Sequence, residues 1–457
     1  MNQSSNLSIG KYRWTICALL FFATTVNYLD RQVLSLLAPD LSKEFNWTNS
    51  DYANITSVFQ FVYAISMLFA GRIIDKLGTK WGYIWAIIIW SLGAIMHAYA
   101  IFFGEVTANL LTWVGLGAVP VSIAGFMLSR AVLGFGEAGN FPAAIKATAE
   151  YFPKKERSFA TGIFNSGANI GAILAPLTVP WIAKHWGWQA AFLVIGAVGF
   201  IWLLFWTFFY EKPEKQKRLS KAEFDYINSD DAQQVEAPIL PQEKISWVKL
   251  LGYKQTWAFV FGKLMTDGVW WFFLFWLPKY LEAQYGMVKT DITFPLTVLY
   301  SMTMVGSIGG GWFPTYFINK GYTPYDGRMK AMLIIALFPL IVLIAQPLGG
   351  ISFWIPVLLI GIGASAHQAW SANIFTTVSD MFPKKAVGSV VGIGGMAGGL
   401  GGVIISKTGG ALFDYYKSLG HIQTGYTIMF SFCALAYLIA WVVMKILVPK
   451  YKPITDL

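Results

Sequence analysis

The chain has 457 residues, of which 56% are hydrophobic and only 13% are charged. A soluble protein carries about a quarter charged residues, so the composition excludes an ordinary soluble domain. Apolar runs of about twenty residues recur from end to end, and each can cross about 30 Å of hydrocarbon. The runs are continuous rather than alternating, which argues against a β-barrel. The sequence therefore predicts an all-α polytopic membrane protein.

The net charge of +10 does not indicate nucleic-acid binding, because lysine and arginine concentrate in alternate loops. This distribution is the positive-inside pattern of membrane proteins. We expect the lipid bilayer as partner and no nucleic acid. We also expect both termini and the central loop to be cytoplasmic, in a multi-pass protein of the inner (plasma) membrane. Cys17 and Cys433 lie in apolar runs and indicate no disulfide framework.

Twelve spans follow one another along the chain. The predicted spans are 14–37, 51–72, 81–103, 120–149, 157–181, 189–210, 255–281, 292–317, 329–347, 351–378, 386–411 and 424–447. A polar stretch that carries both signs of charge divides them six and six. We therefore expect an N-terminal six-helix bundle at 1–210, a cytoplasmic linker at 211–254 and a C-terminal six-helix bundle at 255–457.

An extra apolar segment lies at 102–122, between the third and fourth spans. If it crossed the membrane, every later span would invert and the positive-inside pattern would fail. We therefore expect it to form an extracytoplasmic loop, either a hairpin or an interfacial helix.

The two halves contain an internal repeat. The tetrapeptide FPKK occurs at Phe152 and again at Phe382, and a glycine-rich apolar run follows each copy at the same distance. The same offset aligns Glu137 with His367. Because each half has six helices, the repeat keeps its orientation in the membrane, as in parallel-repeat transporters.

Charged residues inside the apolar spans are the strongest indication of function. Asp30 and Arg31 lie in the first span, and Arg130 and Glu137 lie in the fourth. Arg130 and Glu137 are seven residues apart, so they project from one helix face, two turns apart. Such charges cost about 3 kcal/mol each at the centre of a membrane helix. They form either the polar centre of a transporter or structural ion pairs.

The loop GRIIDKLGTK, from Gly71 to Lys80, resembles the loop signature of the major facilitator superfamily. Gly71 permits close helix packing, and Asp75 can accept hydrogen bonds at a helix N-terminus. With twelve spans, a central linker and a parallel repeat, the chain is identified as a member of this superfamily. The resemblance implies the major facilitator fold, with twelve transmembrane helices in two six-helix bundles.

Three stretches resemble the anion:cation symporter branch of the superfamily, and the bacterial hexuronate transporters within it. They are NYLDR from Asn27, SRAVLGFGEAGNFPAAIKATAEYFPKKERS from Ser129, and GKLMTDGVWWFFLFWLPKYL from Gly262. The resemblance covers nearly the whole chain, although the segment 102–122 departs from the shorter loop expected. It implies a symporter for a sugar-acid anion, with the proton as coupling ion. We expect no other cofactor and a monomeric protein.

The resemblance also implies roles for the charged residues. Arg31 would bind the substrate carboxylate, and Asp30 and Glu137 would carry the coupled proton. Arg130 would tune Glu137, and Tyr63 of the second span would belong to the substrate site. These roles suit the chemistry, because the planar arginine fork can hold a carboxylate through two hydrogen bonds.

Two asparagines of the fifth span are further candidates for substrate binding. Asn165 and Asn169 are four residues apart and share a helix face. They either hydrogen-bond between helices or bind sugar hydroxyls. Ala168 stands where the aldonate-type relatives have a glutamine, which weakens an aldonate interpretation.

In the seventh span, Lys263 and Asp267 are also four residues apart. We expect a mutual ion pair, with Lys263 kept as a candidate substrate ligand. Trp270 and Trp271 follow on the next turn, and aromatic rings beside polar groups suit the face of a sugar.

The tenth span contributes Gln368, Trp370 and Asn373 as candidate substrate contacts, because they oppose the charges of the first half across the repeat. His367 could titrate, but we expect it to be a hydrogen-bonded packing residue.

The leading hypothesis is a proton-coupled symporter that imports a hexuronate, such as galacturonate or glucuronate, by alternating access. An aldonate or another organic anion is the alternative substrate. A membrane receptor that binds the anion without moving it is the alternative class, although binding alone needs no proton site. No nucleophile, metal cluster or phosphate-binding loop is visible in the sequence, so we do not expect an enzyme.

Overall fold

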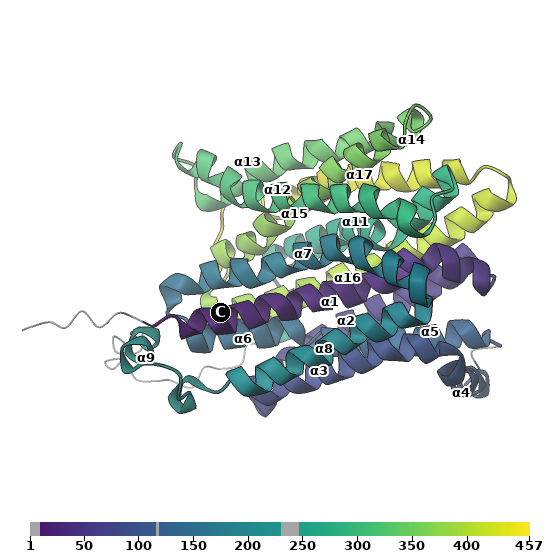
Figure 1. The fold of residues 1–457 in the computed structure, drawn as a ribbon. Helices are drawn as coiled ribbons and strands as arrows, with labels where there is room; N and C mark the ends of the chain where they lie inside the picture. Colours follow the sequence, from purple (N-terminus) through teal and green to yellow (C-terminus); the bar gives the residue numbers. More distant parts are fainter. Residues whose placement is uncertain (1–9, 116–117, 230–245) are drawn as a thin grey trace, which may run out of the picture.

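The computed structural model describes residues 10–115, 118–229 and 246–457, and this part of the chain is helical without strands (Figure 1). The α-helices are α1 Tyr12–Glu44, α2 Asn49–Leu77, α3 Thr79–Met96, α4 Ala100–Trp113, α5 Val121–Glu137, α6 Asn140–Tyr151, α7 Lys154–Trp186, α8 Trp188–Phe209, α9 Lys221–Ile227, α10 Trp247–Leu251, α11 Lys254–Tyr285, α12 Thr293–Ile318, α13 Pro324–Leu337, α14 Ala345–Leu348, α15 Trp354–Met381, α16 Lys384–Ser418 and α17 Ile422–Leu447. Short 3₁₀ helices are η1 His97–Tyr99, η2 Pro213–Lys215, η3 Lys289–Ile292 and η4 Phe338–Ile344.

Ten helical stretches in the described residues are long and apolar enough to cross a membrane. Two further helices, α1 and α15, have 33 and 28 residues but are more polar. The polarity of α1 comes from residues such as Asp30 and Arg31 in its middle, and that of α15 from residues such as His367 and Gln368. Together they make the twelve predicted spans, in two bundles of six.

The extra apolar segment forms the helix α4, which continues from α3 and packs on the start of α5. A Cβ atom added at Gly104 would stand 2.0 Å from the Val121 carbonyl oxygen. One added at Gly125 would stand 1.7 Å from the Ala100 carbonyl oxygen. The backbones of α4 and α5 therefore touch, and the chain returns along α5 without crossing the membrane an additional time. The expected loop is a helical hairpin.

The internal repeat is confirmed by the helix boundaries. α7 begins at Lys154 and α16 begins at Lys384, directly after the two copies of FP. Pro153 and Pro383 precede these helices with extended backbone, ψ 153° and 148°. Proline is suited to a helix start because its missing N–H would have no partner there.

The bundle has two distinct ends. Figure 1 shows the start of α1, the helix α9 and the C-terminus at one end, which we name the linker end. α4 and the turn between α1 and α2 lie at the opposite end, named the far end. The first half comprises α1 to α8 and the second half α11 to α17. The halves meet where α2 packs on α16, α1 on α11 and α7 on α12.

Small residues let α2 and α16 approach closely. A Cβ atom at Gly399 would stand 2.6 Å from the Ala64 Cβ atom, and one at Gly410 would stand 2.6 Å from the Ala53 Cβ atom. Close contact between small residues is the usual way in which membrane helices associate. The two halves are therefore in direct contact along much of these helices.

The linker holds the first half together at the linker end. Glu223 of α9 accepts hydrogen bonds from the backbone N–H groups of Tyr12, at 3.1 Å, and Arg13, at 3.0 Å. These amides open α1 and have no partner within the helix. The Arg13 guanidinium also reaches Glu223 at 3.2 Å and Glu156 of α7 at 3.0 Å. Residues 230–245 of the linker lie outside the described residues.

Candidate functional site

The centre of the first half is an ion pair between α1 and α5. Arg31 donates from Nε at 2.9 Å and from Nη2 at 2.7 Å to Oε2 of Glu137. Both residues are buried, at 4% and 1% exposure. The second carboxylate oxygen, Oε1, has no hydrogen-bond partner among the described residues. Glu137 is therefore held by the arginine of another helix.

Arg130 contacts the backbone of α1. Its two terminal nitrogens each donate to the Arg31 carbonyl oxygen at 3.3 Å, and its guanidinium lies 5.4 Å from the Phe59 ring. Although Arg130 and Glu137 share a helix face, no hydrogen bond joins them among the contacts described for these residues. Arg130 acts on Glu137 only through its charge, across a longer distance. The spacing of Arg130 and Glu137 on one helix had predicted that the two side chains lie closer together.

Asp30 is a buried carboxyl without a hydrogen-bond partner. It is 2% exposed, and neither of its carboxyl oxygens has a partner in the described part of the chain. The charges that act on it are those of Glu137 and Arg130. An ionised carboxylate in such a place is costly unless a cation or donor compensates it. Asp30 is therefore a buried carboxyl that receives no hydrogen bond from the described residues and on which Arg130 acts only through its charge.

Four aromatic rings surround the Arg31 guanidinium. Their centroids lie at 4.7 Å for Tyr28, 5.1 Å for Tyr63, 5.1 Å for Trp271 and 5.4 Å for Phe59. Rings at this distance attract a cation through their negative faces. We name these four rings the aromatic box. Tyr63 and Trp271 were considered for the site from the sequence, and Tyr28 and Phe59 were not.

Both of the missed rings had a signal in the sequence. Tyr28 precedes Arg31 by three residues and Phe59 precedes Tyr63 by four, so each shares a helix face with a predicted site residue. Trp271 comes from the second half, and its contact with Arg31 is seen only in the packing of the two halves. The box thus joins both halves around one arginine.

The expected ion pair in α11 is confirmed. Lys263 Nζ lies 2.6 Å from Asp267 Oδ2, and the ammonium group also lies 4.2 Å from the Phe375 ring centroid. The lysine side chain is 5% exposed and that of the aspartate is 18% exposed. Both charges are therefore compensated within one helix.

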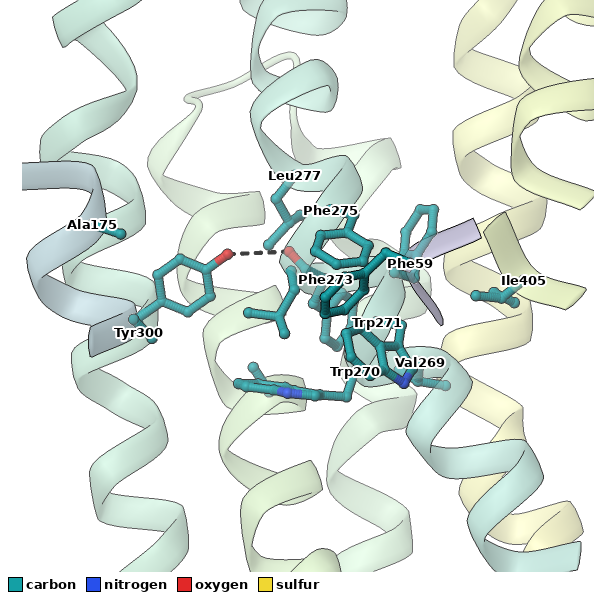
Figure 2. Close-up of a cluster of buried hydrophobic side chains, with 14 of the residues drawn as sticks. Phe59, Ala175, Val269, Trp270, Trp271, Phe273, Phe275, Leu277, Tyr300 and Ile405 are labelled. Carbon is teal, nitrogen blue, oxygen red and sulfur yellow. Dashed lines mark hydrogen bonds between the residues drawn. The ribbon is translucent and has the colours of Figure 1, made fainter. Parts of the chain in front are cut away.

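The two neighbouring tryptophans of α11 point in different directions (Figure 2). Trp271 reaches the aromatic box, whereas the Trp270 ring stacks on His367 of α15, with centroids 5.1 Å apart and planes at 5°. His367 also hydrogen-bonds through Nδ1 to the Tyr437 hydroxyl at 2.9 Å. Trp270 therefore packs inside the second half, beside the packing histidine that we expected.

Asn373 is a structural amide. Its Nδ2 donates at 2.8 Å to the Gly310 carbonyl of α12 and at 2.8 Å to the Ala369 carbonyl of its own helix. One amide hydrogen is thus used between helices and the other within α15, which leaves no donor for a sugar hydroxyl. Trp370 is fully buried and packs edge-on against Tyr437, with ring centroids 5.6 Å apart. These two candidates from the sequence lie away from Arg31, among the helices of the second half.

The remaining candidates differ in accessibility. Gln368 is half-buried, Asn165 is exposed and Asn169 is 8% exposed. Gly167 of α7 packs on α1, since a Cβ atom there would stand 2.4 Å from the Phe21 carbonyl oxygen. Residues two positions before and after it lie about 200° around the helix. Asn165 and Asn169 therefore face away from α1.

The comparison with known families decides what kind of protein holds this site. Residues 20–406 match the family model of the Major Facilitator Superfamily. The chain belongs to the major facilitator superfamily. This protein is accordingly a membrane transporter and not an enzyme, and its predicted fold class and family are confirmed.

Two relatives of this transporter are named after sugar acids. The Hexuronate transporter of Escherichia coli K12 is 30% identical over 435 residues, which cover 95% of this chain and 94% of that protein. The Galacturonate transporter of Dickeya chrysanthemi is 32% identical over 305 residues, which cover 67% and 82%. The fold resembles that of a bacterial homologue of the human lysosomal transporter Spinster, with a TM-score of 0.69, 18% identity and coverage of 96% and 97%.

In this transporter the two halves are tied together at the far end by a carboxylate. Asp414, in the last turns of α16, accepts hydrogen bonds from the backbone N–H groups of Asn49, at 2.8 Å, and Ser50, at 2.7 Å. These are the first amides of α2, at the positive end of its dipole. A residue of the second half therefore caps a helix of the first.

Further polar contacts close the same end. Lys279 of α11 donates to the Ser42 hydroxyl at 3.0 Å, and Lys43 pairs with Glu282 at 2.6 Å. Among the side chains that the structure describes, no hydrogen bond or ion pair joins the two halves at the linker end. Within the described part of the chain, these polar contacts therefore join the two halves at the far end.

Proposed function

We propose that this protein is a proton-coupled symporter that imports a sugar-acid anion, a hexuronate such as galacturonate or glucuronate, by alternating access. The observation that carries the proposal is the Arg31–Glu137 pair, because Nε and Nη2 of Arg31 both donate to the one oxygen Oε2 of Glu137, and a second carboxylate cannot use the same two donors at the same time. A substrate carboxylate that binds Arg31 must displace Glu137.

Displacement links substrate binding to proton uptake. Once Arg31 leaves it, Glu137 is a buried carboxylate without its cation, and it takes up a proton because the charged form is then costly. Arg31 and Arg130 balance Asp30 and Glu137 in charge. An anion that arrives together with one proton leaves this balance unchanged, which supports symport over uncoupled binding.

The aromatic box supports a sugar acid as the anion. Apolar ring faces beside a cation suit a molecule that has a carboxylate at one end and a sugar ring at the other. The names of the relatives at 30% and 32% identity point to the same class of substrate. An aldonate is the second candidate within this class.

The test is uptake of labelled galacturonate into proteoliposomes under an imposed proton gradient, repeated with a sodium gradient. We expect accumulation that follows the proton gradient and vanishes when a protonophore is added. Accumulation that is indifferent to this gradient contradicts proton coupling. Exchange of labelled for unlabelled substrate distinguishes a transporter from a receptor, because a receptor binds without counterflow.

We further propose that the linker end faces the cytoplasm of a cell whose inner membrane holds the protein as a monomer. Basic residues at the linker end, among them Arg72 and Lys76 before the turn between α2 and α3, support this orientation. Labelling of a cysteine placed in the C-terminal residues by an impermeant maleimide tests it. We expect labelling only after the cells are permeabilised.

A further inference from the structure

A stripe of side chains on α11 continues the substrate site toward the linker end. Lys263, Asp267 and Trp271 follow one another at intervals of four residues and so share one face of the helix. Trp271 lies in the aromatic box, 5.1 Å from the Arg31 guanidinium. Four residues of helix rise about 6 Å. The Lys263–Asp267 pair therefore stands about one turn beyond the level of Arg31.

The aspartate is the accessible member of this pair. Its side chain is 18% exposed, whereas that of Lys263 is 5% exposed and lies against Phe375. The charge of Asp267 also acts on Tyr28, whose ring stacks on the Arg31 guanidinium at 4.7 Å. Asp267 thus adjoins the aromatic box from the side of the linker end.

The separation fits the length of a six-carbon acid. Five C–C bonds of about 1.5 Å extend roughly 6 Å in a zigzag chain. An open-chain six-carbon diacid whose first carboxylate binds Arg31 therefore brings its second carboxylate to the level of Asp267, and the ring of a hexuronate turns its hydroxyl groups toward the same side. At that level the far end of the substrate meets Lys263, whose charge Asp267 already compensates.

We propose that the Lys263–Asp267 pair contacts the far end of the substrate and restricts the site to acids with a single carboxylate. This inference rests on the proposed function and adds a specificity determinant to it. The paired site offers hydroxyl groups both an acceptor and a donor, which suits the uncharged end of a hexuronate. A second carboxylate there meets the like charge of Asp267, which opposes its binding.

The pair can also become a binding site for a second anion when the charge of Asp267 is removed. Without the aspartate charge, the buried ammonium group of Lys263 lacks its counterion. A substrate with carboxylates at both ends can supply one, and a substrate with one carboxylate cannot. The same lysine therefore selects opposite substrates according to the charge of residue 267.

The test compares galacturonate with galactarate, which has a carboxylate in place of the far aldehyde carbon. Affinities of purified protein are measured by competition for wild type and Asp267→Asn. We expect the ratio of galactarate to galacturonate affinity to rise at least tenfold in Asp267→Asn. Lys263→Gln leaves the aspartate unpaired, and we expect the ratio to fall. The double variant lacks both charges, and we expect no gain.

Glu282→Gln is the matched control, since it breaks an ion pair of the same helix, with Lys43, outside the site. It should leave the ratio unchanged. An unchanged ratio in Asp267→Asn that still binds galacturonate overturns the inference, as does an equal gain in the double variant. If Asp267→Asn does not fold, an unchanged ratio in Lys263→Gln overturns it. A wild type that binds neither acid overturns the proposed function instead.

Discussion

The carboxylate of Asp414 joins the two halves at the far end, and it therefore sets how readily this transporter opens there. Asp414 accepts two short hydrogen bonds from the first amides of α2. Asparagine at this position keeps the shape but loses the charge, and its NH₂ group faces a backbone donor. One bond is lost and the other becomes neutral, which costs about 2 kcal/mol. The partial exposure of the site reduces this to about 1.5 kcal/mol, which corresponds to roughly a tenfold change in an equilibrium constant.

Distances between spin labels measure this equilibrium. Trp186 of α7 and Leu419 after α16 are exposed residues at the far end, one from each half. Labelled cysteines at these sites report on far-end opening, and the native Cys17 and Cys433 are buried. We expect Asp414→Asn to increase the population of long distances about tenfold where the far-end-open state is a minor one. An unchanged distance distribution in a folded variant refutes this reasoning.

A matched control exists on the same helix end. Asp51 belongs to the capping box of α2 and accepts hydrogen bonds from the Thr48 backbone at 2.9 Å and hydroxyl at 2.7 Å, all within the first half. Asp51→Asn weakens the helix start by about 1 kcal/mol and removes no hydrogen bond to the second half. We expect a lower melting temperature and no change in the label distances. A similar shift in both variants would mean that the helix start, and not the contact between the halves, controls opening.

Other predictions concern the ion pairs. Glu137→Gln should keep exchange of labelled substrate but lose accumulation driven by a proton gradient; full accumulation would remove Glu137 from the coupling. Arg31→Lys replaces a planar fork by a point charge, and we expect at least tenfold weaker sugar-acid binding in a competition assay. Glu223→Gln should destabilise the first half by about 2 kcal/mol, measured by thermal unfolding in detergent, because it uncaps α1. The Lys80 ammonium lowers the pKa of Glu211 through a hydrogen bond of 2.7 Å. A carboxyl with a lowered pKa stabilises the folded state above its unfolded pKa and stops doing so as the pH falls through the lowered value. Glu211→Gln should therefore cost up to about 0.5 kcal/mol at pH 7, because solvent screens this half-buried pair, and the cost should disappear once the pH is below the lowered pKa.

The sequence predicted the spans and the repeat correctly, because apolar length and repeated FPKK motifs are local features. It also identified the four central charges, since any charge in an apolar helix is costly. It could not pair them. Helical spacing relates Arg130 to Glu137 on one helix, whereas the Arg31–Glu137 contact depends on how α1 packs beside α5, 106 residues apart in sequence.

The second half was harder to predict, because the rotation of a helix about its axis decides which residues face the site. Trp270 and Trp271 are equivalent in composition, yet only Trp271 reaches Arg31. Asn373 has the chemistry of a sugar-binding residue, but the Gly310 carbonyl of α12 takes its amide. The roles of the remaining candidates stay predictions.

The hydrogen bonds from Glu223 to the start of α1 have a consequence for biosynthesis. The amide of Tyr12 receives its cap from a residue 211 positions later. During translation the first span therefore enters the bilayer with an open end, and its cap is synthesised only after five more spans. A separately expressed first half should accordingly end after Ile227, where α9 is complete, and not after Phe209, where the sixth span stops.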